Sequence, residues 1–451
     1  MRELTRRLSL DYPVLLWTQW GWPIWIGISG RFNSESTADL RRNLQIAGEN
    51  GIKAATCVFN AVFYSLWFFC LLRLTGRAKV RPIHVLLFLF GGCLFNYRLL
   101  MIRVQGASLA FLFFGLFAYL NERSLLLYAI TFLFSWLYSG SYILLFLIGT
   151  LICFQYLKER QVECVQTGIR LIGVFVAGKV LNPTFPGNVL FEWDYLWMYA
   201  ASADLALGNA EYMPLSLKYM ILGLPLGLLG VVISFYGLTF QYRSQSHRFL
   251  ALCASTICLF ILTLRFSRSL ESFYPVSCLT LFYYCFTRSF SQRTIIKSVV
   301  LVFLAYNAVP TVRFLHHIYS REYDYKVALI ELAEQMENQV EPGSIIYNTV
   351  CSDFDLLFYG NPDCRYVCGH DIHYMHSYSP YLTQVYYDPR NSVYYMQGGD
   401  LSDVLKKEFS AEYVVLREDT GSYSLYNDLL SRCTQKELIY SVNGVFLYRL
   451  T

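Results

Sequence analysis

Two short segments place arginine side chains among long apolar runs. They are residues 96–105 and 265–275, and each carries further polar groups. The side chains able to do chemistry there are four guanidinium groups, an amide, a carboxyl and a phenol: Arg98, Arg103, Arg265, Arg268, Gln105, Glu271 and Tyr274. A guanidinium group binds phosphate or diphosphate oxygens with paired N–H donors. We therefore predict that the arginines bind a phosphate, and that Gln105, Glu271 and Tyr274 contact the rest of the substrate.

The same arginines have a purely structural alternative. Long basic side chains at helix ends can extend to lipid headgroups. Ionisable groups near the depth of the bilayer are costly, so they are usually paired or line a functional cavity. These segments are expected on the extracytoplasmic side, where clusters of basic residues are uncommon, and this bias favours the phosphate site.

Acidic and aromatic residues adjoin each other in the long loop 182–216. Glu192 and Asp194 lie beside Trp193 and Tyr195. Aromatic rings can stack on the apolar face of a sugar while carboxylates accept its hydroxyl groups, so we take Glu192 and Asp194 as substrate-binding candidates. Aromatic belts are common at membrane interfaces, and they favour an interfacial helix for the same residues.

Cysteine and histidine residues gather in a second loop, nearer the C-terminus. They are Cys364, Cys368, His370, Asp371, His373 and His376. Such side chains bind zinc, but their spacing fits no finger or HExxH pattern, so no metal site is predicted. A surface loop with one disulfide explains the same residues. With Cys351 and Cys433 the tail has four cysteines, and in an oxidising compartment one or two disulfides of open pairing are expected.

Long apolar segments must position these residues. Hydrophobic residues make up 55% of the chain and charged residues only 15%, which is typical of a protein that crosses a membrane several times. Lipid offers no partner to backbone N–H and C=O groups, so the spans must be helices. The predicted spans are Gly51–Leu74, Pro82–Phe95, Gly106–Leu120, Thr167–Leu181, Leu217–Phe240, Arg248–Leu264, Ser272–Phe286 and Ile295–Phe314.

Two stretches are expected to be broken. Leu125–Leu157 is too long for one span, and Ser139–Ser141 is expected to divide it into two short helices. Gly173 and Gly178 are expected to interrupt Thr167–Leu181. Short, broken helices of this kind usually bend around a cavity lined by protein or water.

Basic residues fall on alternate loops and predict the orientation. One side carries Arg73, Arg77, Lys79, Arg81, Arg123, Lys158, Arg160, Arg243, Arg248, Arg288, Arg293 and Lys297. Cytoplasmic loops are enriched in Lys and Arg, so we place that side in the cytoplasm. The two arginine segments, the loop 182–216 and the tail after residue 320 then lie outside.

After residue 320 the chain takes the pattern of a soluble domain. Its helices are predicted at 325–336, 353–358, 401–409 and 423–431. Its strands are predicted at 344–347, 365–368, 413–416, 438–441 and 445–448, and an Asn-Gly turn joins the last two. Strands that alternate with helices indicate a small α/β layer.

The predicted fold is therefore a polytopic α-helical membrane bundle with a small C-terminal extracytoplasmic α/β domain. Its parts are residues 1–50 with an interfacial or spanning helix, the bundle 51–319 and the soluble domain 320–451. The net charge of +5 is modest and spread over loops, which argues against nucleic-acid binding. The absence of a GxSxG elbow, a P-loop and a GxGxxG fingerprint argues against soluble nucleotide-binding catalysis.

Four stretches resemble the GT-C superfamily of integral membrane glycosyltransferases, which use polyprenyl-phosphate-linked sugars. Asp11–Leu15 is similar to the acid-plus-YPPL segment of the first external loop. Tyr97–Leu109 is similar to the stretch that enters a later span, and Arg268–Pro275 to the arginine–tyrosine–proline stretch before a late helix. The tail from Glu341 to Leu450 is similar to the strand-rich end. The likeness covers most of the chain through short motifs.

The resemblance implies Asp11 as the catalytic carboxylate, which would act as a general base or orient the acceptor hydroxyl. The chain also departs from the family. Such enzymes open with a membrane helix and an acidic pair, but Glu3 and Asp11 are the only acids in residues 1–30, and Gln105 stands where an acid is usual. The base is then Asp11, an acid of the loop 182–216, or absent. If Met1 is a late start, Pro13–Gly30 is an interfacial helix, and otherwise it spans.

The leading hypothesis is an integral membrane glycosyltransferase of the plasma or inner membrane, acting in the cell envelope. It would transfer a sugar from a polyprenyl-phosphate donor to a glycan or lipid acceptor, with membrane lipid as its surroundings. The alternatives are a transporter or flippase of an anionic lipid-linked substrate and a non-catalytic, degenerate scaffold. No inverted repeat supports the transporter, whereas the missing acidic pair supports the scaffold. No cofactor is required by the motifs, and a divalent cation is possible.

Overall fold

A computed structural model describes most of the chain. The described residues are 34–76, 80, 83–100, 105–190, 192–193, 215, 217–287, 313, 324–369, 372–418, 423–433 and 436–451. The chain divides into two compact units, Met1–Phe314 and Leu315–Thr451. The predicted span Ile295–Phe314 lies outside the described residues except for Arg313.

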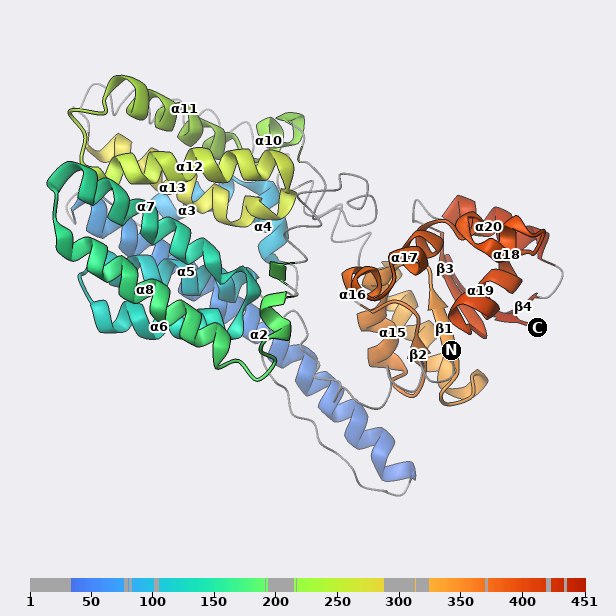
Figure 1. The fold of residues 1–451 in the computed structure, drawn as a ribbon. Helices are drawn as coiled ribbons and strands as arrows, with labels where there is room; N and C mark the ends of the chain where they lie inside the picture. Colours follow the sequence, from blue (N-terminus) through green and yellow to red (C-terminus); the bar gives the residue numbers. More distant parts are fainter. Residues whose placement is uncertain are drawn as a thin grey trace. The chain divides into compact units, whose positions relative to one another are not determined.

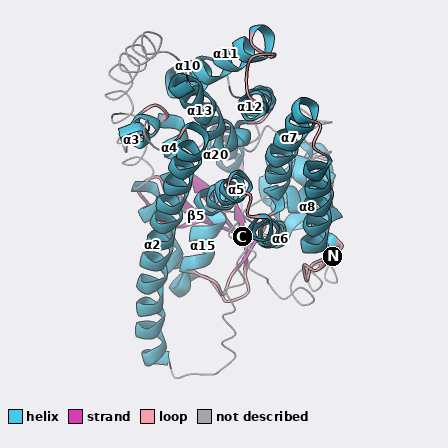
Figure 2. Ribbon diagram, turned by 90° about the vertical axis from the view of Figure 1, so that its left-hand side faces the viewer, coloured by secondary structure: helices cyan, strands magenta, loops and turns pink. Residues whose placement is uncertain are grey.

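The described part of the first unit is helical throughout (Figure 2). Its helices are α2 (Ser34–Thr75), α3 (Ile83–Phe90), α4 (Cys93–Leu100), α5 (Gln105–Leu120), α6 (Ser124–Leu137), η1 (Ser139–Ser141), α7 (Tyr142–Glu159), α8 (Val162–Val180), α10 (Leu217–Gly223), α11 (Pro225–Phe240), α12 (His247–Arg265), η3 (Ser267–Ser269) and α13 (Leu270–Thr287). Figure 1 shows α12 between α11 and α7, with α8 packed beside α7.

Three of the described helices are long and apolar enough to cross a membrane. They are Ala54–Thr75, Ser139–Glu159 and His247–Arg265, and the bent pair α10–α11 makes a fourth candidate. The division of Leu125–Leu157 at Ser139–Ser141 is confirmed, since η1 separates α6 from α7. The described part of the first unit is thus a helical bundle with a few candidate membrane helices.

Three predicted spans need correction. Leu217–Phe240 is not one helix, because α10 and α11 meet at an angle of 108°. Pro225 disfavours the helical conformation at Leu224, whose φ and ψ are −141° and 45°. Pro82–Phe95 is divided between α3 and α4. Thr167–Leu181 was expected to be interrupted at Gly173 and Gly178, but α8 continues through both glycines.

A pair of glycines explains the break between α3 and α4. A Cβ atom on Gly92 would lie 2.4 Å from the ring of Tyr274, and one on Gly91 would lie 2.1 Å from Leu226. The backbone can therefore approach α13 and α11 closely only because both residues lack a side chain. Tyr274 and Trp67 stack on the same aromatic ring, that of Phe88, with centroids 5.2 and 4.3 Å away.

Helix ends gather at two ends of the bundle. At one end His247 Nδ1 lies 2.6 Å from Glu159 Oε1, Lys158 donates to the carbonyl of Tyr242, and Arg73 donates to the carbonyl of Leu120. We call this the basic end. The opposite end holds the C-termini of α4 and α12 and the N-terminus of α13, and we call it the arginine end after Arg98, Arg265 and Arg268.

The second unit is built on a mixed sheet. The strands are β1 (Ile345–Asn348), β2 (Arg365–Tyr366), β3 (Tyr413–Arg417), β4 (Lys436–Val442) and β5 (Val445–Leu450), in the order β2-β1-β3-β5-β4. β1 is parallel to β2 and β3, whereas β5 is antiparallel to β3 and β4. Side chains alternate along β3, so Val415 and Val414 belong to separate cores on the two faces.

Helices cover both faces of this sheet. One core contains the helix over residues 324–339 and α15 (Phe354–Gly360), and the other contains α17 (Pro380–Tyr387), α19 (Leu401–Phe409) and α20 (Tyr423–Arg432). The predicted strands and helices of the tail agree with these elements to within a few residues. The remaining elements are η4 (Cys351–Asp353), α16 (Ile372–Tyr378), η5 (Pro389–Asn391) and α18 (Val393–Met396).

The helices between residues 372 and 396 are missing from the sequence prediction. One start signal was present, because Ser379 caps α17 by accepting a hydrogen bond from the Leu382 N–H, and Pro380 follows as the first helical residue. The apolar residues in this stretch are too few and too widely spaced to produce a clear helical period.

Candidate functional site

The arginine end is built around an ion pair between Arg98 and Glu271. Arg98 Nη1 lies 3.0 Å from Glu271 Oε1, and Nη2 lies 3.4 Å from Ser267 Oγ. The two charged side chains are only 11% and 10% exposed. A buried charge is tolerated when it is paired and hydrogen-bonded, which this arrangement provides for both partners.

Local structure explains why these residues meet. Arg98 lies in the last turn of α4 and Glu271 in the first turn of α13. A cation at a helix C-terminus and an anion at a helix N-terminus both oppose the partial charge of the helix end. Phe266 is extended (φ −136°, ψ 110°) and ends α12, so that η3 carries Ser267 and Arg268 to the same place.

A second buried ion pair lies at the C-terminus of α8. Lys179 Nζ is 2.6 Å from Glu192 Oε1 and 3.2 Å from the carbonyl oxygen of Tyr138. The side chains are 7% and 19% exposed. Burial raises the pKa of the Glu192 carboxyl above its ordinary value, and the positive charge of Lys179 offsets part of that rise.

The two pairs belong to one charged region. The phenol of Tyr142, at the N-terminus of α7, interacts electrostatically with both Arg268 and Glu192. The described side chains there combine four cations with two carboxylates: Arg98, Lys179, Arg265, Arg268, Glu192 and Glu271. An excess of positive charge, with guanidinium groups among its sources, suits a phosphate-bearing ligand.

Gln105 is buried beside this region, at the start of α5. The residue is 3% exposed, and its Oε1 atom accepts no hydrogen bond from the described residues. The neighbouring Asn60 donates from Nδ2 to the carbonyl of Leu99, while its Oδ1 is likewise unsatisfied among the described residues. Asn60 is a residue that the sequence analysis missed, although a lone amide within an apolar span is itself a signal.

Tyr274, which the sequence analysis placed among the substrate contacts, faces the core of the bundle. Its side chain is completely buried, and its hydroxyl donates to the carbonyl oxygen of Phe88 at 2.7 Å. The ring fills the space that Gly91 and Gly92 leave open. Tyr274 therefore holds α3 against α13, one helical turn from Glu271 but facing the core.

The remaining predicted site residues are placed as follows. Arg265 and Arg268 are half-buried at the arginine end. Asp11, Arg103 and Asp194 lie outside the described residues. The structure therefore brings Arg98, Glu271 and Arg268 together, while the roles assigned to all of these residues stay predictions.

The cysteine–histidine segment does not assemble as one cluster. Cys364 packs in the core on one face of the sheet and Cys368 in the core on the other face, so they cannot bridge to each other or share a ligand. Among the described residues no group of three or more His, Cys, Asp or Glu side chains could hold a metal ion. His370 and Asp371 lie outside those residues.

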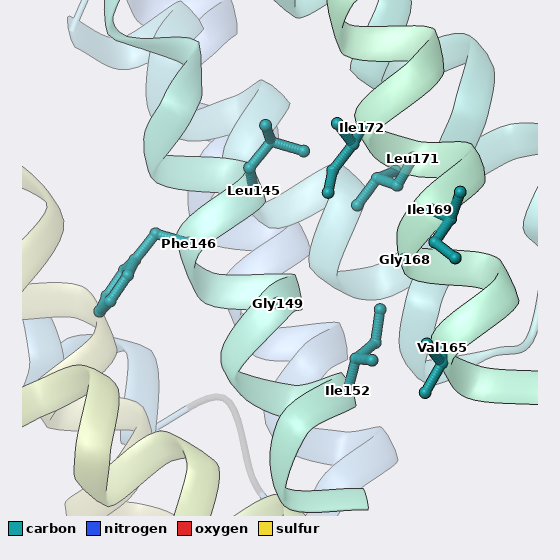
Figure 3. A pocket seen from close by; sticks show the side chains of 9 residues that line it. All are labelled: Leu145, Phe146, Gly149, Ile152, Val165, Gly168, Ile169, Leu171 and Ile172. Atoms are coloured by element: carbon teal, nitrogen blue, oxygen red, sulfur yellow. The ribbon is translucent and has the colours of Figure 1, made fainter. Parts of the chain in front are cut away.

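An apolar groove of about 430 Å³ lies between α7 and α8. Figure 3 shows side chains from the two helices on its sides, with Gly149 and Gly168 on the facing helices. Its lining residues are Leu145, Phe146, Gly149, Ile152, Val165, Gly168, Ile169, Leu171 and Ile172. None of these nine residues has a polar side chain, so the groove suits a hydrocarbon chain.

Comparison with known proteins supports the fold of the chain. No protein-family model and no curated protein matches it. The chain is similar in structure to the Archaeoglobus fulgidus oligosaccharyltransferase in its apo form, with a TM-score of 0.50 and 12% sequence identity. The match covers 89% of this chain but only 63% of that protein. The neighbour belongs to the GT-C superfamily, and at this identity the likeness concerns the fold.

Proposed function

We propose that the protein transfers a sugar from a polyprenyl-phosphate donor to a lipid or polymer acceptor at the arginine end of the bundle. The observation that carries the proposal is the buried guanidinium of Arg98, held by Glu271 and Ser267 beside η3. Among the described residues, these two hydrogen bonds use two of the five N–H groups of Arg98. The fold shared with an oligosaccharyltransferase supports the same conclusion.

The chemistry requires positive charge near the leaving group. Breaking the anomeric C–O bond leaves negative charge on the donor phosphate, and fixed cations stabilise that developing charge. Arg98 and Arg268 would contact the phosphate, with Arg265 and Arg103 contributing. Glu271 would act through Arg98, whose guanidinium it orients.

A carboxylate must also receive the proton of the acceptor hydroxyl. Asp11 is the base that the resemblance implies, and Glu192 is an acid of the loop 182–216 that lies at the arginine end of the bundle. Burial gives Glu192 a raised pKa, which makes its ionised form a stronger base. Gln105, with an amide oxygen free of described partners, would accept a hydrogen bond from a sugar hydroxyl.

The orientation follows from the distribution of charge. Arg73, Lys158 and Arg243 belong to the basic end, which we place in the cytoplasm. The arginine end and the tail are then extracytoplasmic, in a plasma or inner membrane. The hydrocarbon chain of the donor would lie in the groove between α7 and α8, which runs from the level of Leu145, one turn below Tyr142, toward Ile152.

The test is transfer of radiolabelled sugar from a panel of polyprenyl-phosphate sugars in membranes that contain the full chain. Arg268→Ala should abolish transfer, and Arg243→Ala is the matched control, because Arg243 is an exposed arginine at the basic end. Native-like melting of both variants must be shown first. Full transfer by folded Arg268→Ala would remove the phosphate-binding role.

One observation favours transport of an anionic lipid-linked substrate as the second candidate. Helices α10 and α11 form a sharply broken pair, and broken helices are typical of transporters. In proteoliposomes a transporter would move labelled donor across the bilayer without releasing its sugar to an acceptor. Transfer of the sugar to an acceptor in the same vesicles would favour the glycosyltransferase.

A further inference from the structure

We propose that Cys351 and Cys368 form a disulfide bond in the tail. Their sulfur atoms lie 2.8 Å apart, closer than two sulfur atoms that are merely packed together. Sixteen residues separate them, so the bond would join η4 to the end of β2 and enclose α15. The proposal rests on the extracytoplasmic orientation of the tail and does not depend on glycosyl transfer.

Strand pairing fixes the position of Cys368. β1 and β2 are parallel with Ile346 opposite Tyr366, and the side chain of Asn348 continues the ladder beyond the backbone pairing. Asn348 Oδ1 accepts the N–H of Cys368 at 3.0 Å, and Nδ2 donates to the carbonyl of Cys368 at 2.8 Å. Both bonds are buried, so Cys368 is held at the carboxyl end of β2.

Cys351 is held from the other side. It begins η4, three residues after β1, and its Sγ lies 3.3 Å from the hydroxyl of Tyr386. That hydroxyl donates in turn to the backbone carbonyl of Asn348 at 2.6 Å. The same asparagine therefore positions both cysteines, and bond formation needs a shift of less than the length of one covalent bond.

The other two cysteines of the tail do not compete. Cys364 is buried in the core on the opposite face of the sheet, with Leu329 and Leu357. Cys433 follows α20, where its Sγ lies 3.4 Å from the carbonyl oxygen of Leu429. The described geometry supports no pairing of Cys351 or Cys368 with either Cys364 or Cys433.

The bond would form by thiol–disulfide exchange with a disulfide-bearing oxidoreductase of the extracytoplasmic compartment. Cys351 is the more accessible thiol, so its thiolate attacks one sulfur of the oxidant, and the other sulfur leaves as a thiol. The thiolate of Cys368 then attacks Cys351 Sγ. This step displaces the oxidant sulfur to which Cys351 had become bonded, and that sulfur also leaves as a thiol. Two thiol protons and two electrons pass from the tail to the oxidant, whose disulfide is reduced.

Differential thiol labelling of cells that express the full chain tests the proposal. Free thiols are blocked with a maleimide under denaturing acid-quenched conditions, disulfides are reduced, and the released thiols are tagged with a polyethylene-glycol maleimide. The wild type should gain two tags. Cys351→Ser and Cys368→Ser should gain none, while the matched variants Cys364→Ser and Cys433→Ser should keep two.

Peptide mapping keeps the result independent of how the variants fold. Trypsin leaves Cys351 and Cys364 together in the peptide 327–365 and Cys368 in 366–390, so a second digestion before Asp353 is required to separate the first two. The expected product is a cross-link between fragments containing Cys351 and Cys368. A wild-type chain without tags, or a cross-link to another cysteine, would overturn the proposal.

A topology reporter fused to the C-terminus and a transfer assay are run on the same membranes. An unbridged tail on the outside overturns the disulfide alone, and an unbridged tail on the inside overturns the orientation and the disulfide together. A bridged but inactive protein overturns glycosyl transfer while leaving the disulfide in place.

Discussion

Arg98 and Glu271 are 173 residues apart in the sequence, and their charged atoms lie 3.0 Å apart in the bundle. The pair joins the end of α4 to the start of α13, and its two charged side chains are only 11% and 10% exposed. Removing either partner should leave the other as an uncompensated buried charge. Breaking such a pair costs about 3–5 kcal/mol of stability.

A double-mutant cycle on this pair separates its structural from its functional role. Arg98→Gln and Glu271→Gln should each lower the melting temperature of the purified protein, and the double variant should recover part of the loss. Sugar transfer should be absent from Arg98→Gln and from the double variant, because the phosphate ligand is gone in both. Transfer at the wild-type rate by a stable double variant would contradict phosphate binding by Arg98.

Tyr274→Phe should weaken the bundle without stopping transfer. It leaves the buried carbonyl of Phe88 without its hydrogen bond, which costs about 1–3 kcal/mol, and no substrate contact is lost. Tyr242→Phe is the control, because Tyr242 is exposed at the basic end. The melting temperature and the transfer rate are measured for both variants, and they report stability and activity separately. A folded Tyr274→Phe protein with no activity would restore Tyr274 to the substrate site.

The pH dependence of transfer should identify the base. If Glu192 accepts the proton, activity falls as pH drops through its raised pKa, so the half-activity pH lies above the ordinary carboxyl value of 4.5. Lys179→Met removes the charge that lowers this pKa, and it should move the half-activity pH upward. If the Glu192→Gln variant still loses activity at the same low pH as the wild type, another carboxylate is responsible for that loss. Asp11 would then be the next residue to test.

Filling the apolar groove should weaken binding of long-chain donors selectively. In the described part of the chain, no atom outside the local helix lies within 4 Å of a Cβ placed on Gly149 or on Gly173, so both sites accept Leu. Of these two glycines, Gly149 lines the groove and Gly173 does not. Gly149→Leu should raise KM for a long-chain donor by about tenfold, equal to about 1.4 kcal/mol, and change KM little for a short-chain donor. Gly173→Leu is the control. Equal effects of both variants would place the chain elsewhere.

In the tail, Arg417→Met should destabilise the sheet. Arg417 Nη1 lies 2.6 Å from Asp353 Oδ1, and the guanidinium carbon lies 4.1 Å from the ring centroid of Tyr325. The charged partners are 12% and 4% exposed, so loss of the cation should cost about 3 kcal/mol or more. Hydrogen exchange in β3 of the full chain measures the effect.

The exposed pair Arg432–Asp428 provides the control for that experiment. Its side chains are 64% and 54% exposed, so solvent screens the charges and Arg432→Met should cost at most about 0.5 kcal/mol. Equal acceleration of exchange in both variants would show that burial of the Arg417 pair contributes nothing to the sheet.

Local patterns in the sequence were enough to predict many elements. Leu401–Phe409 was predicted at its observed ends, and in the structure a capping box formed by Asp400 and Asp403 begins this helix. The Asn443-Gly444 turn predicted the β4–β5 hairpin, since both residues adopt the positive φ that this turn requires. Leu217–Phe240 failed because continuous hydrophobicity outweighed the stop signal of Pro225 in the prediction.

The sequence by itself determined that the chain carries apolar helices, a strand-rich tail, and polar groups at particular places along both. These properties depend on residues that are close together in the sequence, so the spacing of apolar residues along helices and strands is enough to predict them. Only the tertiary structure decided that Arg98 meets Glu271, that Tyr274 faces the core, and that Cys351 rather than Cys364 lies against Cys368. Each of those contacts joins residues on different elements, so it depends on how helices and strands pack, which no local period encodes.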